Sequence, residues 1–270
     1  MAVVIVLTAV NDSVSYTQCA DPFVRNWEKI NVGSSDTWVP VILRVSDTKV
    51  SLRLGLESFE WSLPTRDMPT SLVAQVSRLL APAYVKADYV VTTDIDMLPL
   101  SLKVLEKSIR QLDRGLTDFV ICRDVLKSKQ FPICYNIASP NIWSQIFPDK
   151  FEHQLSQIWK SIQLDFDGRR GKKGWYFDQE YLYQKISEAE KGGIRVLRFK
   201  DEDTGHHRLD VNRRNKALWP VIGIHVLMGK YTDFHLRLPI SKHNFFVNYI
   251  LILNRVRTSF FKTFYKFKVS

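Results

Sequence analysis

Short apolar runs alternate with amphipathic stretches along residues 1–125, and this alternation constrains the fold more than any other feature of the sequence. Residues 3–8 and 39–45 are rich in β-branched side chains and predict buried strands. Between them, apolar residues recur at helical spacing around Trp27. Because strands and helices that alternate in this way pack as βαβ units, the pattern predicts an α/β fold with a mostly parallel central sheet flanked by helices.

The same alternation continues toward the middle of the chain. Residues 69–82 carry an apolar stripe at helical spacing, and residues 88–93 form a short apolar run that stops at Asp94. An amphipathic helix is expected at 102–112 and a strand at 119–122. In sheets of this type, ligands bind at the carboxyl ends of the strands. Further along, we expect strands at 131–138, 195–199 and 220–226, and helices at 140–146, 151–162 and 176–189.

The composition is that of a folded protein rather than a disordered or fibrous one, with 45% hydrophobic and 24% charged residues among 270. The three cysteines have no metal-ligand spacing and predict buried thiols. The apolar N-terminus lacks a positively charged start, so we expect a buried first strand rather than a signal peptide. No internal repeat or linker interrupts the chain, which favours one domain over residues 1–240.

Two aspartates follow the strand expected at 88–93, at the point where it ends. Asp94 and Asp96 are two residues apart, so in an extended chain both carboxylates point the same way. Their oxygen ligands suit Mg²⁺ or Mn²⁺, which would bridge a diphosphate. The alternative is a pair of surface acids at a strand end, but the buried strand before them favours a metal and diphosphate site.

The stretch from Arg78 to the aspartates resembles a known signature. Arg78-Leu-Leu-Ala-Pro, then the apolar strand and Asp94-Ile95-Asp96, is similar to the central segment of glycosyltransferases with the GT-A fold. Within that fold it resembles glycosyltransferase family 8, which includes bacterial lipooligosaccharide galactosyltransferases. The resemblance implies a GT-A type, Rossmann-like domain in which Arg78, Asp94 and Ile95 bind the donor. It also implies that Asp94 and Asp96 hold the metal.

Two later segments extend the resemblance. Tyr135-Asn136 is similar to the family segment that lines the sugar pocket. Asp178-Gln179-Glu180 is similar to the segment in which the family has an aspartate-glutamine pair beside the reacting carbon. Asp178, Gln179 and Glu180 are therefore the candidate catalytic residues. If the enzyme inverts the sugar, Asp178 or Glu180 would deprotonate the acceptor hydroxyl. Retention, which we favour, would use this region to stabilise the sugar cation. A helix N-terminal cap is a structural alternative for Asp178.

The last matching segment runs from His225 to Lys230. The resemblance implies that His225 completes the metal shell and that Lys230 binds the donor diphosphate. A buried structural histidine after a strand at 221–224 is the alternative, but the glycine and lysine that follow favour the ligand.

The residues at the end of the first strand occupy the usual place for nucleotide contact in such a sheet. We therefore expect Thr8, Ala9, Val10 and Asn11 to bind the donor. A structural turn explains Asn11-Asp12 equally well.

These expectations describe a metal-dependent hexosyltransferase. It would move a hexosyl unit from a nucleotide-sugar donor, with UDP favoured, to a glycan or glycolipid acceptor in polysaccharide biosynthesis. A nucleotidyltransferase that makes the sugar nucleotide is an alternative, but residues 8–12 lack the glycine-rich phosphate loop of that class. A basic nucleic-acid-binding protein is a second alternative. No nucleic-acid motif accompanies the charge, so we expect no nucleic-acid partner.

The net charge of +10 is concentrated in the last quarter of the chain. Residues 1–204 have 26 basic and 26 acidic side chains, whereas residues 205–270 have 12 basic and two acidic ones. Residues 241–270 predict a basic, aromatic C-terminal amphipathic helix. We expect residues 245–268 to bind an anionic membrane surface, which would make the protein cytoplasmic and peripheral on the inner membrane face. Packing of this helix on the core is the alternative.

A polar cluster precedes this tail. His206, His207, Arg213 and Arg214 lie close together in the sequence. We expect a solvated or acceptor-binding loop rather than a second metal site, because adjacent histidines in a loop seldom ligate one ion.

Overall fold

The computed structural model describes residues 1–31, 34–54, 57–63, 67–125, 129–167, 171–210, 218–236 and 244–269, with side chains in the last range described for 245–259. Arg213 and Arg214 lie outside the described residues. The helices are α1 (Val14–Thr17), α2 (Ala20–Ile30), α3 (Thr70–Leu80), α4 (Lys103–Asp113), α5 (Pro140–Ile146), α6 (Phe151–Ile162), α7 (Phe177–Lys191), α8 (Asp201–Thr204), α9 (Trp219–Leu227) and α10 (Asn244–Val269), with a 3₁₀ turn η1 at Ala81–Tyr84. The strands are β1 (Val3–Asn11), β2 (Thr37–Val45), β3 (Lys49–Leu54), β4 (Glu57–Ser62), β5 (Tyr89–Thr92), β6 (Met97–Pro99), β7 (Phe119–Ile121), β8 (Asn136–Ala138), β9 (Val196–Arg198), β10 (Arg208–Asp210) and β11 (Asp233–His235).

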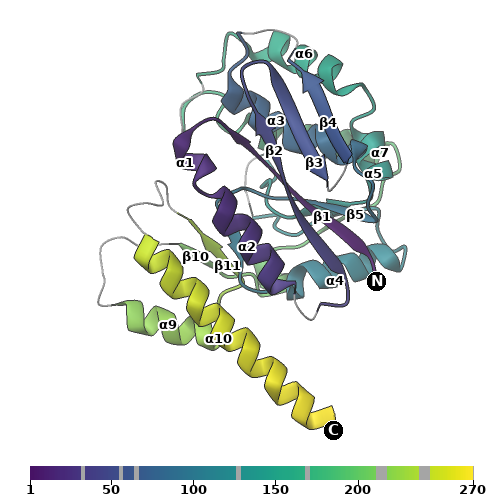
Figure 1. The fold of residues 1–270 in the computed structure, drawn as a ribbon. Coiled ribbons are helices and arrows are strands. Elements are labelled where there is room, and N and C mark those ends of the chain that lie inside the picture. The colour runs from purple at the N-terminus through teal and green to yellow at the C-terminus, as the bar shows by residue number, and fades with distance from the viewer. Residues whose placement is uncertain are drawn as a thin grey trace.

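The central sheet has the strand order β4-β3-β2-β1-β5-β8-β7-β9. β1 pairs in parallel with β2 and β5, and β7 pairs in parallel with β9. β3 and β8 pair antiparallel with both of their neighbours, so these two strands run opposite to the other strands of the sheet. The predicted α/β fold, with a mostly parallel sheet flanked by helices, is therefore confirmed (Figure 1).

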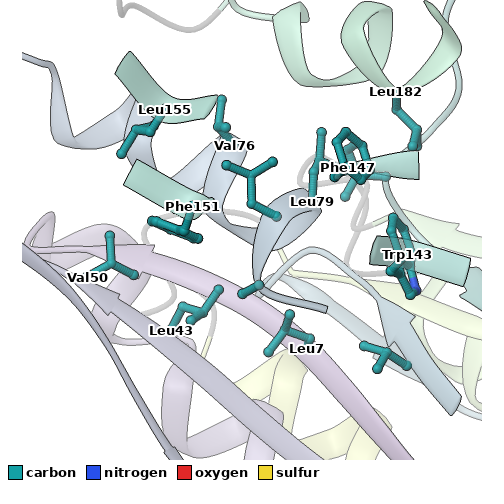
Figure 2. Close-up of a cluster of buried hydrophobic side chains, with 14 of the residues drawn as sticks. Leu7, Leu43, Val50, Val76, Leu79, Trp143, Phe147, Phe151, Leu155 and Leu182 are labelled. Carbon is teal, nitrogen blue, oxygen red and sulfur yellow. The ribbon is translucent and has the colours of Figure 1, made fainter. Parts of the chain in front are cut away.

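Both faces of β1 are buried, as its uninterrupted apolar run predicts. Val4 and Val6 belong to one hydrophobic cluster, whereas Ile5 and Leu7 belong to the other. The first cluster is covered by α2 and α4 and the second by α3, α5, α6 and α7. Figure 2 shows part of the second cluster, where Leu7 faces side chains of α3 and α5. Packing on both faces holds β1 and its parallel neighbour β5 in place, so the edge of the sheet at which both strands end is also held in place.

A second, smaller sheet has the order β10-β11-β6. β6 begins directly after the aspartate motif and pairs antiparallel with β11, so that His235 lies opposite Met97. β10 pairs in parallel with β11. Each of these strands has three residues, and no local pattern in the sequence indicates which strand each one pairs with. This sheet therefore emerges only in the folded chain.

The strand expected at 220–226 is wrong, because Trp219–Leu227 form the helix α9. Pro220 lies in the first turn, where its missing N–H costs no hydrogen bond. Gly223 lies against Tyr249 and Leu253 of α10, and a Cβ at this position would clash with both. Burial against α10 thus outweighs the strand preference of the β-branched residues.

The C-terminal helix α10 packs beside α9, and its far end extends away from the rest of the fold (Figure 1). Its first turns contribute Phe246, Val247 and Ile250 to the first hydrophobic cluster. Among the described residues, no helix is both long and apolar enough to span a membrane. The division of the chain at residue 240 stays a prediction.

Candidate active site

Arg78 joins two carboxylates that come from distant parts of the chain. It lies in the last turn of α3, and its side chain is 13% exposed. Nη1 donates to Oδ1 of Asp94, and Nη2 donates to Oδ2 of Asp178 over 2.5 Å. One guanidinium therefore connects the end of β5 with the first turn of α7.

Cys134 holds the other oxygen of Asp94, with Sγ donating to Oδ2 over 2.7 Å. The next residue, Tyr135, has φ 67°, in the left-handed region that bulky residues rarely adopt. This turn interrupts extended backbone, so the strand expected at 131–138 is shortened to Asn136–Ala138. The turn is also what brings the thiol of Cys134 to the aspartate.

The protonation states within this cluster follow from burial and charge. Burial would raise the pKa of Asp94, but the charge of Arg78 and the hydrogen bond from Cys134 outweigh it and lower that pKa. Burial raises the pKa of Asp178, although Arg78 opposes the rise. Burial and the charge of Asp94 raise the pKa of the Cys134 thiol, which keeps it a protonated donor. Asp94 is therefore an anion held between two donors.

A histidine of β11 contacts Asp96. Nε2 of His235 lies 3.3 Å from Oδ2 of Asp96, and its Nδ1 lies 2.9 Å from Oδ1 of Asp210. Burial would lower the pKa of His235, but hydrogen bonds to the two aspartates raise it. In many metal sites, a carboxylate on one ring nitrogen orients the other toward the metal. Asp210 is in position to orient His235 in that way.

The predicted third ligand, His225, lies on α9. Its Nε2 is 3.3 Å from Nζ of Lys230, and its ring centroid is 6.2 Å from that of Tyr231. Lys230 is exposed just beyond the end of α9. The histidine in contact with Asp96 is His235, so the metal role of His225 stays a prediction without a supporting contact.

The donor set of this region suits a hard divalent cation. Asp94, Asp96 and His235 offer carboxylate oxygens and one imidazole nitrogen, ligands that Mn²⁺ accepts and that a soft metal would not select. In the part of the chain that the structure describes, no three such side chains are grouped closely enough to hold an ion as they lie. The chemistry of these side chains therefore fits Mn²⁺. The sequence predicted His225 as the third ligand, whereas the histidine that contacts Asp96 is His235.

Tyr135 and Asn136 follow Cys134, and both side chains are buried, so that donor binding by them stays a prediction. The hydroxyl of Tyr135 donates to Oδ1 of Asp233 over 2.5 Å, and Nδ1 of His206 lies 3.0 Å from Oδ2 of the same aspartate. Nδ2 of Asn136 donates to the carbonyls of Pro132 and Ile133. These contacts brace the turn that carries Cys134.

The predicted nucleotide contacts lie at the end of β1. Thr8 and Val10 are buried, whereas Ala9 and Asn11 are partly exposed at this edge. Nδ2 of Asn11 donates to Oγ1 of Thr70 over 3.3 Å, at the first residue of α3. The side chain of Asn11 therefore ties β1 to the helix that carries Arg78. Donor binding by these residues stays a prediction.

The three candidate catalytic residues differ in exposure. Asp178 is 1% exposed, and its Oδ1 accepts from the main-chain N–H of Gln179 over 2.9 Å. Gln179 is partly exposed, and its carbonyl accepts from the main chain of Phe131. Glu180 is exposed and accepts from Nε2 of Gln130 over 2.9 Å. Among these three residues, only Asp178 has a described hydrogen bond with Arg78.

Comparisons with solved structures find matches to glycosyltransferases. The glycosyltransferase GlyE of Streptococcus pneumoniae TIGR4 matches 87% of this chain with 10% identity and a TM-score of 0.45, and this chain spans about half of GlyE, 54%. The galactosyltransferase LgtC, in complex with donor and acceptor sugar analogs, matches 93% of this chain and 95% of its own, with 11% identity and a TM-score of 0.44. A glycosyltransferase involved in glycosylation of the major capsid of PBCV-1 matches 86% of this chain and 92% of its own, with 11% identity and a TM-score of 0.41. No family model and no curated protein sequence matches the chain.

Sequence reasoning missed three residues that contact the aspartate motif or its partner, namely Cys134, Asp210 and His235. A weak signal was present for His235. It lies two residues after Asp233, and the apolar Phe234 and Leu236 alternate with this polar pair as in a strand. No local pattern indicates that this strand pairs with β6.

Proposed function

We propose that this chain is a glycosyltransferase of the GT-A type, which moves a hexosyl unit from a nucleoside-diphosphate sugar to a glycan or lipid-linked glycan. UDP is the favoured donor nucleotide because the resembled family uses it most often. The reaction class rests on the site and the motifs.

One contact carries the proposal, that of Arg78 with both Asp94 and Asp178. The motif resemblance places these three residues around the donor sugar and its diphosphate. In the fold they meet although they come from α3, the end of β5 and α7. Two separate motif matches, one from Arg78 to Asp96 and one at Asp178, would have no reason to converge if each had arisen by chance.

The residues of this cluster would act mainly by charge and position. Arg78 and Lys230 supply cationic groups for the departing diphosphate, whose negative charge grows as the sugar bond breaks. Asp94 is held in place by Arg78 and Cys134, so it needs little reorganisation when the donor binds.

A divalent cation, Mn²⁺ or Mg²⁺, would bind Asp94, Asp96 and His235, with Asp210 orienting the imidazole. When bound, it would neutralise charge on the diphosphate leaving group. This assignment replaces His225 with His235 as the proposed third ligand, because only His235 has a described contact with Asp96.

Retention of the sugar configuration fits the surroundings of Asp178. An inverting enzyme needs a base that reaches the acceptor hydroxyl. Both oxygens of Asp178 are occupied, by Arg78 and by the main chain of Gln179, and the residue is buried. The burial of Asp178 favours a role in stabilising positive charge near the sugar over one as the base that an acceptor hydroxyl must reach.

We further propose that residues 245–268 contact an anionic membrane surface from the cytoplasmic side. The six basic and no acidic residues of 241–270 support an anionic partner. Such contact would bring the protein to lipid-linked acceptors in polysaccharide biosynthesis.

The test is release of UDP from UDP-sugars, with and without acceptor, in Mn²⁺ and after chelation. Asp94→Ala is expected to reduce the rate by about 100-fold or more, because a charged group at the reaction centre is lost. Glu28→Ala, a change to an exposed acid of α2, is the matched control and should leave the rate unchanged. An Asp94→Ala protein with the wild-type rate on every donor would refute the proposed function, and full activity after chelation would refute the metal assignment.

A further inference from the structure

Apart from His225, the residues of helix α9 are apolar or glycine, yet one side of the helix faces solvent. Val221 is 48% exposed, Ile224 56% and Met228 65%, and Leu218 and Leu227 flank them. Residues 218, 221, 224 and 228 follow helical spacing, so they form one row along the helix. Helices that are apolar all round are normally buried. We define these five residues as the α9 row.

The side of α9 opposite the α9 row is held against the fold, so the helix cannot rotate to bury the row. Gly223 and Val226 are buried, and Gly223 allows the close approach of Tyr249 and Leu253. The ring of Trp219 stacks on Phe245, with centroids 5.8 Å apart. These contacts fix the rotation of α9, so the α9 row stays on the surface.

The helix α10 exposes apolar side chains as well. Phe245 is 75% exposed, and Ile252 and Val256 are each 53% exposed. By helical spacing these three lie on the same side of α10 as Tyr249, which contacts α9. We call the α9 row and these three residues the exposed apolar surface of the α9–α10 pair, and exposed apolar groups of this kind mark interaction sites.

The charge around this surface indicates the partner. Residues 205–270 have 12 basic and two acidic side chains. Both acids are engaged within the fold, since Asp233 is 2% exposed and Asp210 pairs with His235 and Arg208. An exposed apolar row in a segment with an excess of cations, whose two acids are engaged, complements the anionic surface of a bilayer rather than a second copy of this basic chain.

We propose that the α9 row inserts into the interfacial layer of an anionic membrane, so that α9 and not only the tail anchors the protein. The chain leaves α9 at Leu227 and reaches His235, beside Asp96, in β11. Insertion of α9 therefore places the candidate active site next to the membrane surface. This inference rests on the proposed function and makes it more specific, because the acceptor would be a glycan presented at the membrane on a lipid.

The experiment is sedimentation of the full chain with vesicles of equal phosphatidylglycerol and phosphatidylcholine, and with phosphatidylcholine alone. Wild type should bind the anionic vesicles and bind the neutral ones far more weakly. The Val221→Asp/Ile224→Asp variant should lose affinity for anionic vesicles by about tenfold or more. Leu164→Asp, at a position 95% exposed outside this surface, is the matched control and should bind as wild type does.

A second variant separates insertion from repulsion by the added acids. Ile224→Ser/Met228→Ser keeps the net charge and should still lose several-fold in affinity. Wild-type binding by both the Asp and the Ser variants would overturn the inference, and so would loss in the Asp variant alone. A wild-type dimer that the Ser variant converts to a monomer, with neither protein bound to vesicles, would also overturn it in favour of self-association.

Thermal unfolding of each variant checks that the fold is intact, and vesicle binding requires no catalysis. Vesicle binding without donor turnover would therefore refute only the proposed function. Donor turnover without vesicle binding would refute only the insertion of α9.

Discussion

The imidazole of His235 lies against the carboxylate of Asp96, with Nε2 3.3 Å from Oδ2. His235 belongs to β11, which pairs antiparallel with β6, and it lies opposite Met97, the residue that follows Asp96. His225, which the sequence favoured for the same role, instead lies near Lys230 on α9. The difference between the two histidines can be measured.

We predict that His235→Ala raises the Mn²⁺ concentration needed for half-maximal UDP release by about tenfold to 100-fold, as loss of a ligand or its orientation does in other metal sites. His225→Ala should change that Mn²⁺ concentration less than about threefold, because His225 has a described contact with Lys230 and none with the aspartate motif. A Mn²⁺ titration of both variants, paired with the Mn²⁺-dependent rise in melting temperature, measures the effect. The reverse order of sensitivity would restore His225 as the ligand.

Arg78 is the only cation that the described contacts place between Asp94 and Asp178. Arg78→Met is expected to lower the free energy of unfolding by about 3–5 kcal/mol, because the buried carboxylate of Asp178 and the partly exposed one of Asp94 both lose their partner. Arg78→Lys should also be impaired, since an ammonium cannot form both planar contacts.

Urea unfolding of Arg78→Met, Asp178→Asn and the double variant measures this coupling. The double variant should lose clearly less than the sum of the single losses, because each change removes the same contact. Additive losses would show that the two side chains do not interact in solution.

The Tyr135 hydroxyl is expected to stabilise the turn that carries Cys134. Tyr135→Phe removes a donor from the buried Asp233 and should cost about 1–2 kcal/mol in the free energy of unfolding. Tyr176→Phe, at an exposed tyrosine, is the control and should cost little. If the turn positions Asp94, kcat should fall along with stability, and unchanged kcat would limit Tyr135 to a structural role.

The pair of Arg123 and Asp201 should make stability depend on pH at the acid end. Burial would raise the pKa of Asp201, but hydrogen bonds from Arg123, over 3.0 and 2.7 Å, lower it below its usual value of 3.8. Because the folded-state pKa is depressed, the contribution is complete above about pH 4 and is lost as the pH falls through the folded-state value.

Asp201→Asn tests this dependence. The variant should be about 1–3 kcal/mol less stable at neutral pH, because Arg123 is left buried without its partner. The difference from wild type should shrink below about pH 4. A difference that stays constant down to pH 2 would contradict the assignment.

Much of the central sheet was predictable because its signals are local. The run of β-branched residues in β1 and the apolar stripe of α3 each repeat within a few residues, so periodicity identifies them. The aspartate motif was predictable for the same reason, since its place directly after β5 is a property of adjacent residues. The pairing of β11 with β6 and β10 joins segments that are distant in the sequence, so no local pattern reveals it.

The sequence by itself determined the α/β class, the strand that ends at Asp94 and the motif residues that approach it. Tertiary structure decided which partners those residues meet. It brought Arg78 between Asp94 and Asp178, chose His235 for Asp96, and made a helix of α9, whose β-branched residues predicted a strand. The physical reason is that local propensities differ by about 1 kcal/mol or less per residue, whereas burial against α10 and pairing with β6 involve whole elements distant in the sequence.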